Sequence, residues 1–178
     1  MWDERGRPSP WSPPAVFQTG ILDPAGWKAR WIGGSGPAPF LRKTFALPAA
    51  VKRATAHASA LGLYELRLNG KRVGDSLLAP EWTDYRKRVQ YQTYDVTGLL
   101  HEGENVAGAI LGEGWYAGKI GLTGIVPDGP SRGIYGARPF FFLQMEIELA
   151  DGTKRFVNSE ETWKVTAEGP ILGSTILD

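Results

Sequence analysis

Two stretches of this 178-residue chain place large aromatic rings beside a carboxylate. The first supplies Trp82, Asp84 and Tyr85, and the second supplies Glu113, Trp115 and Tyr116. Aromatic rings of this kind stack on the apolar C–H face of a sugar, while a carboxylate accepts hydrogen bonds from its hydroxyl groups. We therefore interpret these six residues as a candidate carbohydrate-binding site.

Calcium is the one cofactor that these loops could hold. The ion takes about six to eight oxygen ligands from carboxylates, carbonyls and water. Asp75 and Asp84 lie on the same predicted loop and are candidate ligands. The sequence permits this ion without requiring it, so calcium is an optional cofactor here.

The acidic residues could also be catalytic. Glycoside hydrolysis needs two carboxyl groups that face each other across the scissile bond. Asp75, Asp84, Glu113 and Asp128 all fall on predicted loops, but none of them lies in a catalytic motif. The sequence also lacks a Ser-His-Asp arrangement, a phosphate-binding glycine loop before a helix, and a His-Glu-x-x-His motif. We therefore predict no catalytic residue in this chain.

A second interpretation gives the same loops a structural role. Trp82 and Trp115 would then be buried anchors that hold the loops in shape. Residue type alone leaves both interpretations open for each tryptophan. For the domain as a whole, we favour recognition of a ligand.

The candidate loops are bounded by segments with the period-two pattern of β-strands. Apolar and polar side chains alternate over residues 64–68, and Asn69-Gly70 follows them. This dipeptide predicts a type I′ hairpin turn, because that turn needs a positive φ at both central residues. A loop over residues 74–87 then leads to a strand around residues 89–93, which Asp95 ends with Asx-turn chemistry.

Strands are also predicted over seven further ranges, namely 40–47, 53–60, 106–111, 139–149, 153–157, 163–166 and 171–177. In 139–149, five apolar residues alternate with polar ones, which places one face of the strand in the core and the other in water. Hairpin signals recur at short spacing and helical periodicity is missing. The sequence therefore predicts an all-β fold, an antiparallel β-sandwich of jelly-roll or galactose-binding-like type.

Three aromatic residues outside these loops have simpler interpretations. Trp27 and Trp31 follow Asp23-Pro24, a plausible cap for a single helical turn. The two indoles could stack on a sugar, but we expect them to anchor the connector against the sandwich. We expect His57 to hydrogen-bond to a neighbouring strand rather than to bind a metal.

The composition excludes several classes of function. Twenty Lys and Arg residues stand against 19 Asp and Glu, so no net field draws the chain to nucleic acid. The one basic cluster, Arg86-Lys87-Arg88, is typical of a solvated strand end. Cysteine is absent, which excludes disulfides and thiolate metal sites. No apolar run reaches the roughly 20 residues of a membrane span and no signal peptide is visible, so no membrane contact is expected and the compartment stays open.

The first twenty residues differ from the rest. Asp3–Gly6 is typical of a hairpin turn, and the proline-rich stretch after it is typical of the last, edge strand of a fibronectin-type sandwich. We therefore assign residues 1–20 to the end of a preceding fibronectin-like domain or to a linker, and residues 21–178 to the sandwich domain. The chain also stops within an apolar strand at residues 176–178, so we expect a fragment of a longer protein.

Several blocks of the sequence resemble a known family. Residues 68–75, 78–97 and 111–121 read LNGKRVGD, LAPEWTDYRKRVQYQTYDVT and LGEGWYAGKIG. They look like the signature blocks of the N-terminal β-sandwich domain of bacterial α-L-rhamnosidases. The flanking blocks WKARWI, FLRKTFALP and WKVTAEGPILGSTI follow in the family's order.

The resemblance implies a division of labour within a larger enzyme. In that family, hydrolysis of terminal α-L-rhamnosides with inversion is assigned to a separate helical (α/α) barrel domain, and no part of that barrel is present in this sequence. A sandwich of this kind can bind rhamnose with calcium. The resemblance therefore implies an accessory domain that recognises a rhamnose-containing carbohydrate and has the barrel of the same polypeptide as its partner. The six loop residues remain assigned from residue type and loop position alone.

Overall fold

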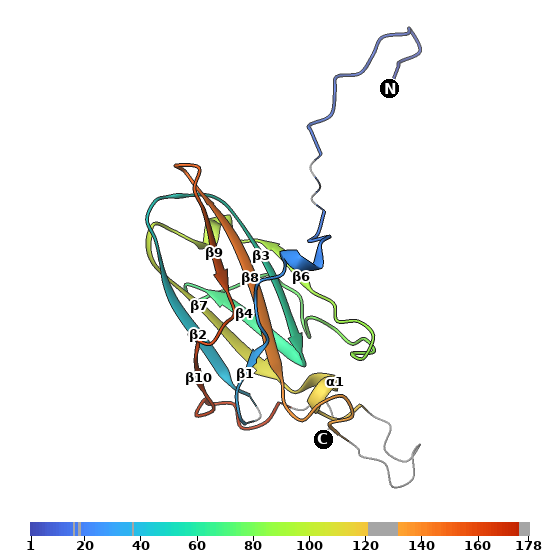
Figure 1. Ribbon diagram of the computed structural model, residues 1–178. Helices are drawn as coiled ribbons and strands as arrows, with labels where there is room; N and C mark the ends of the chain where they lie inside the picture. Colours follow the sequence, from blue (N-terminus) through green and yellow to red (C-terminus); the bar gives the residue numbers. More distant parts are fainter. Residues whose placement is uncertain (16, 18, 37, 121–131, 175–178) are drawn as a thin grey trace.

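The computed structural model describes residues 1–15, 17, 19–36, 38–120 and 132–174. It consists of two β-sheets packed face to face, and all of their strand pairs are antiparallel (Figure 1). The all-β antiparallel sandwich predicted from the sequence is therefore confirmed. Its jelly-roll connectivity stays a prediction.

Each sheet has five strands. Sheet I contains β1 (Ile32–Gly33), β8 (Phe140–Leu149), β3 (Val51–Leu61), β6 (Gln92–Asp95) and β9 (Lys154–Asn158). In it, β8 pairs with β3 along one edge and with both β1 and β9 along the other. Sheet II has the order β10 (Lys164–Thr166), β2 (Phe40–Leu47), β7 (Gly103–Gly112), β4 (Leu63–Leu68) and β5 (Lys71–Arg72).

The helical segments in the described ranges are single turns. They are η1 (Pro24–Gly26), η2 (Thr97–Leu99) and α1 (Gly114–Ala117). No helix in this part of the chain has the length and apolar character needed to cross a bilayer.

The core lies between the two sheets and follows the alternating pattern of the sequence. On β8, the predicted inward face is fully buried and consists of Phe141, Leu143, Met145, Ile147 and Leu149. Burial of each such side chain contributes about 1.5–3 kcal/mol. On β3, the inward residues are alanines with no exposed surface, Ala54, Ala56, Ala58 and Ala60. Their small size leaves room for the larger side chains of β8 and sheet II.

Two turns form as the sequence predicts. Asn69 and Gly70 have φ values of 51° and 80° between β4 and β5, both positive as a type I′ turn requires. After β6, the Oδ1 atom of Asp95 accepts hydrogen bonds from the Thr97 backbone N at 3.0 Å and from the Thr97 hydroxyl at 2.6 Å. These turns fix the direction of the chain at both ends of the first candidate loop.

The connector before β1 packs against sheet I, as expected. Asp23 caps η1 by accepting a hydrogen bond from the Ala25 N at 2.8 Å, but the turn ends at Gly26 and neither tryptophan is helical. The Trp27 ring makes edge contacts with His57, Tyr91 and Phe142 at centroid distances of 5.8, 5.0 and 5.4 Å. Trp31 also contacts Phe142, at 5.2 Å. The two indoles are therefore anchors.

His57 also behaves as expected. Its Nδ1 atom lies 3.0 Å from the hydroxyl of Thr93, its partner on β6. Burial lowers the pKa of His57, and the nearby Glu146 carboxylate opposes this effect. The ring is a neutral, hydrogen-bonded part of the sheet.

Three sequence expectations differ from the structure. Residues 89–91 lie outside β6, because the Ser59 hydroxyl rather than a neighbouring backbone group binds the Gln90 carbonyl, at 2.6 Å. Residues 171–174 form no strand, since Pro170 and Gly173 interrupt regular pairing. The rest of that predicted strand lies outside the described residues. The segment after β7, expected as a loop, contains α1.

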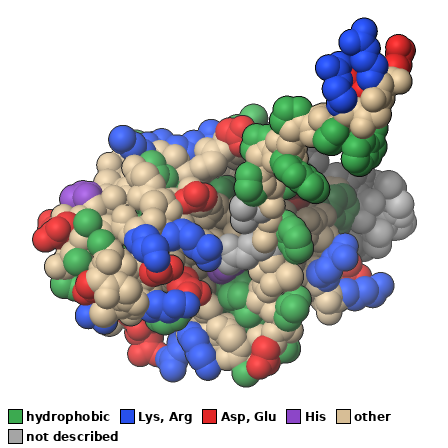
Figure 2. Space-filling view, turned by 90° about the horizontal axis from the view of Figure 1, so that it is seen from above, with side chains coloured by type: hydrophobic (Ala, Val, Ile, Leu, Met, Phe, Trp, Pro, Cys, Tyr) green, Lys and Arg blue, Asp and Glu red, His purple; other side chains and the backbone are tan. Residues whose placement is uncertain are grey.

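The N-terminal arm, residues 1–19 as far as they are described, extends away from the sandwich (Figure 1). Trp2 and Pro8 form an isolated antiparallel bridge around a turn in which the Gly6 N donates to the Asp3 O at 2.9 Å. The described residues between Ser9 and Thr19 contain no strand. Seen from above, the arm has basic side chains at its tip and hydrophobic ones along its length (Figure 2). Its assignment to a preceding domain or a linker stays a prediction.

Candidate functional site

The first candidate loop crosses from β5 in sheet II to β6 in sheet I. Its start is fixed on β4, because the Val73 N donates to the Leu66 O at 2.9 Å and the Tyr64 N donates to the Ala79 O at 3.0 Å. Ala79 and Pro80 are buried. The loop therefore leaves the core next to Trp82, which is 47% exposed.

The second candidate segment follows β7 as the single turn α1. Gly114 begins this turn with φ of 51°, and a Cβ atom there would lie 2.8 Å from the Leu63 Cγ. Both the backbone conformation and the lack of space therefore require glycine. The chain returns beside this turn, since the Gly133 N donates to the Gly118 O at 3.2 Å and the Gly136 N donates to the Tyr116 O at 3.3 Å.

The structure brings the four predicted aromatic rings together. The Trp82 and Trp115 rings stack with centroids 6.0 Å apart and planes 12° from parallel. The Tyr85 ring makes a T-shaped contact with the Tyr116 ring at 5.2 Å. The two loops thus meet at one end of the sandwich, as the binding hypothesis requires.

Two further residues complete this cluster. The Tyr135 ring contacts the Tyr85 ring at 5.1 Å, and the Arg86 guanidinium lies 5.3 Å from the Tyr135 centroid. Arg132 forms an ion pair with Glu113. No sequence pattern indicates Arg132 or Tyr135, because only the pairing of the chain on both sides of residues 121–131 places them here.

Two buried polar atoms of the cluster lack hydrogen-bond partners among the described residues. Glu113 is 9% exposed; its Oε1 atom accepts from the Arg132 guanidinium, whereas its Oε2 atom is buried without a donor. The Tyr85 hydroxyl is likewise buried without a partner. Burial raises the pKa of Tyr85 to about 12, with a further contribution from Tyr135. An unsatisfied buried polar group lowers the stability of a protein by about 1–3 kcal/mol, so a hydrogen-bond partner for either atom would be stabilising.

Asp84 and Asp75 are not part of the buried cluster. Asp84 closes its own turn: its Oδ1 atom accepts from the Arg86 N at 3.2 Å, and its Oδ2 atom lies 3.5 Å from the Lys87 Nζ. Asp75 is exposed and forms no ion pair or hydrogen bond within the described ranges. Asp128 lies outside the described residues.

The described residues show no cluster of ligands for a calcium ion. The described part of the chain contains no group of three or more His, Asp or Glu side chains that could hold a metal ion. Two separate aspartates fall short of the about six to eight oxygen ligands that calcium takes. Calcium ligation by Asp75 and Asp84 stays a prediction, and nothing proposed below depends on the ion.

Comparison with known proteins identifies relatives over most of the chain. The family described as "Alpha-L-rhamnosidase N-terminal domain" matches residues 49–178. An α-L-rhamnosidase from Streptomyces avermitilis is 46% identical over 170 residues, which is 88% of this chain and 16% of that enzyme. One from Formosa agariphila is 34% identical over 99% of this chain and 20% of that enzyme. The chain thus spans about a fifth or less of the length of these relatives.

Solved structures agree with these relatives. A native α-L-rhamnosidase from Aspergillus terreus superposes with a TM-score of 0.83 and 34% identity, over 99% of this chain and 21% of that chain. The S. avermitilis α-L-rhamnosidase complexed with L-rhamnose gives a TM-score of 0.73 and 47% identity, over 79% of this chain and 13% of that chain.

A lectin from Pleurotus ostreatus shares the fold. It is 15% identical, with a TM-score of 0.52 over 92% of this chain and 42% of that chain. By sequence and by structure, the chain belongs to the family of α-L-rhamnosidase N-terminal domains.

Proposed function

We propose that this domain recognises a rhamnose-containing carbohydrate as the accessory part of a larger α-L-rhamnosidase. Hydrolysis of terminal α-L-rhamnosides by the parent protein, and its catalytic (α/α) barrel as the partner of this domain, are parts of the same proposal. The relative that was solved with L-rhamnose supports this class of ligand.

One observation carries the proposal. Among the described residues, the Tyr85 hydroxyl and the Glu113 Oε2 atom are a donor and an acceptor buried without partners, on the two loops whose four aromatic rings meet. Hydroxyls of a sugar that inserts between the two loops would satisfy both atoms, and nearly half of the Trp82 surface is exposed for stacking on the C–H face of a pyranose. A monosaccharide makes few contacts, so we expect an affinity around millimolar, or about −4 kcal/mol.

A structural role is the second candidate function, and the ring contacts favour it. Trp82 already stacks on Trp115, and Tyr85 is held between Tyr116 and Tyr135. In this case the cluster shapes the end of the sandwich for packing on another domain. Trp82→Ala would then destabilise the fold, and rhamnose would leave the protein unchanged.

A titration of the chain with L-rhamnose, followed by tryptophan fluorescence, distinguishes the two functions. We expect a saturable change that Trp82→Ala abolishes and that Trp11→Ala retains, because Trp11 is 99% exposed on the N-terminal arm. Repeating the titration with calcium and with a chelator tests the optional ion. No response up to the order of tens of millimolar, in a folded protein, leaves only the structural role.

A further inference from the structure

A row of basic side chains crosses the outer face of sheet II. In the strand register, Arg42 on β2 lies opposite Lys164 on β10 and opposite Gly108 on β7. On the other side of β7, Arg67 on β4 lies opposite both Gly108 and Arg72 on β5. Residues directly opposite each other point to the same face of a sheet. The row therefore contains four cations and one glycine.

This row is unfavourable for the stability of the sheet alone. Like charges placed directly opposite on neighbouring strands are destabilising. Glu65 compensates one side, since its carboxylate lies 2.7 Å from the Arg67 Nε and 3.7 Å from the Arg72 Nε. The side chains of Arg42 and Lys164 form no ion pair or hydrogen bond with any described residue. The structure thus leaves two cations available for an anion from outside.

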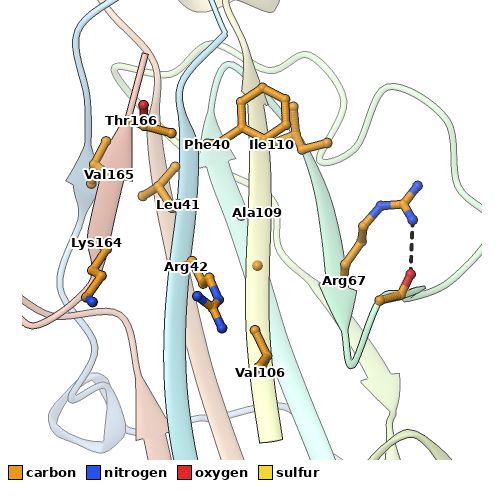
Figure 3. Close-up of a pocket in the computed structure, with 12 residues that line it drawn as sticks. Phe40, Leu41, Arg42, Arg67, Val106, Ala109, Ile110, Lys164, Val165 and Thr166 are labelled. Atoms are coloured by element: carbon orange, nitrogen blue, oxygen red, sulfur yellow. Dashed lines mark hydrogen bonds between the residues drawn. The ribbon is translucent and has the colours of Figure 1, made fainter. Parts of the chain in front are cut away.

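The row crosses a groove of about 570 Å³. Three cations of the row line the groove, Arg42, Arg67 and Lys164. Its apolar lining includes Phe40, Val106, Ile110 and Val165. Figure 3 shows Arg42 and Arg67 on either side of the strand that carries Ala109, which is β7. A Cβ atom at Gly108 would contact only the Leu41 O, at 3.6 Å. The surface of the groove between Arg42 and Arg67 is therefore formed by the Gly108 backbone and not by a side chain.

We propose that this groove binds a uronic acid unit of an acidic carbohydrate. Neighbouring strands are about 4.8 Å apart, so a carboxylate above Gly108 is within reach of long side chains from both flanking strands. A guanidinium matches a carboxylate with two parallel hydrogen bonds, and Arg42 has all of its donors available. The paired Phe40 and Ile110 side chains, two residue pairs further along and therefore on the same face, offer an apolar surface to the C–H face of the sugar ring.

The size and charge of the site favour this ligand over a larger polyanion. The groove volume lies within the roughly 300–1,000 Å³ of small-ligand sites. The net charge of the whole chain is only +1, so the positive field is local. The groove shares no residue with the aromatic cluster, so this proposal does not depend on rhamnose recognition.

Isothermal titration of the full chain with a galacturonic acid trimer tests the proposal, with a neutral galactose trimer as the reference ligand. We expect the acidic trimer to bind and the neutral one to give no heat. The double variant R42Q/K164Q should lose about tenfold or more in affinity, because two charge-assisted contacts are removed. The matched control K28Q/R155Q removes the same charge from exposed residues on the side of sheet I and should bind like the unaltered chain.

Several results would overturn the proposal. They are no binding of the acidic trimer, equal loss in both double variants, or equally tight binding of a sulfated neutral trimer, which would show attraction without carboxylate recognition. Self-association of the chain that R42Q/K164Q abolishes would instead make the groove an interface between copies.

Two controls accompany the titration. R42Q/K164Q should melt at no lower temperature than the unaltered chain, because like-charge repulsion is relieved. Trp82→Ala should leave the affinity for the acidic trimer unchanged, which separates this site from the aromatic cluster.

Discussion

Two buried tyrosine hydroxyls of this domain are in opposite hydrogen-bonding situations. The Tyr64 hydroxyl lies 3.0 Å from both the Tyr94 hydroxyl and the Gln92 Oε1, and 3.3 Å from the Ala58 O. The Tyr85 hydroxyl has no partner among the described residues. A comparison of the two hydroxyls therefore measures what a buried polar atom contributes to stability with and without a hydrogen bond.

Removing these two hydroxyls should have opposite effects. We expect Tyr64→Phe to lower the free energy of unfolding by about 1–3 kcal/mol, because its buried partners lose a hydrogen bond. Tyr85→Phe should be neutral or stabilising, and should weaken binding of rhamnose. Urea denaturation of both variants measures the first effect, and the fluorescence titration measures the second. A larger loss of stability in Tyr85→Phe than in Tyr64→Phe would contradict this account.

The same phenols predict how stability depends on alkaline pH. Burial raises the pKa of Tyr85 to about 12 and also raises the pKa of Tyr64. In the unfolded chain both titrate near about 10, so above that pH the unfolded state loses its protons first. Their contribution to stability is complete below about pH 10 and is lost as the pH rises towards 12.

Urea midpoints measured between pH 8 and pH 11 check this expectation. The midpoint should fall above about pH 10, and the fall should be smaller in the double variant Y64F/Y85F. An equal fall in both proteins would assign the alkaline loss of stability to other groups.

At the scale of elements, a pair of asparagines joins two turns of sheet II. Asn69 donates to the Leu99 O and to the Asn105 Oδ1, both at 2.8 Å, and accepts from the Val106 N at 2.8 Å. Asn105 has no exposed surface and donates to the His101 O at 2.7 Å. The hairpin turn and the turn before β7 are therefore held together by side chains, not only by their own backbone conformations.

Asn69→Gly separates these two contributions. Glycine suits the positive φ of this turn, yet we expect a loss of about 1–3 kcal/mol because the hydrogen bonds of the Asn69 side chain disappear. Gly70→Ala is the complementary control: a Cβ atom there meets nothing within 4 Å, so only the backbone conformation opposes it, at about 1–2 kcal/mol. Chemical denaturation compares the two. Unchanged stability in Asn69→Gly would show that the network is dispensable.

The elements that could be predicted from the sequence have local signals. The Asn69-Gly70 dipeptide and the alternating pattern of β8 each predict a conformation that depends on only a few neighbouring residues. The meeting of Trp82 with Trp115 followed from loop position, whereas Tyr135 depends on backbone pairing across residues 121–131. The basic row could not be predicted, because Arg42 and Arg67 become neighbours of Gly108 only through the register of strands far apart in the chain. A shift of one residue would turn them to the other face.

At the scale of the whole molecule, the division of labour expected from the family resemblance predicts that this chain alone has no hydrolytic activity. Asp75 and Asp84 are exposed, and Glu113 is paired with Arg132, so the three candidate acids within the described residues do not face each other as a free pair. We expect no turnover of an aryl α-L-rhamnoside above the buffer rate. Turnover that survives repurification and disappears in Glu113→Gln or Asp84→Asn would make the domain itself catalytic.

The stacked tryptophans also have an optical consequence. Two indoles with centroids 6.0 Å apart and planes 12° from parallel are close enough for their electronic excitations to couple. The resulting far-ultraviolet circular dichroism belongs to the pair, so replacing either Trp82 or Trp115 should remove it completely. A ligand that tilts or separates the rings changes this exciton signal directly. Far-ultraviolet circular dichroism can therefore detect, without an added label, a change in the arrangement of the two loops.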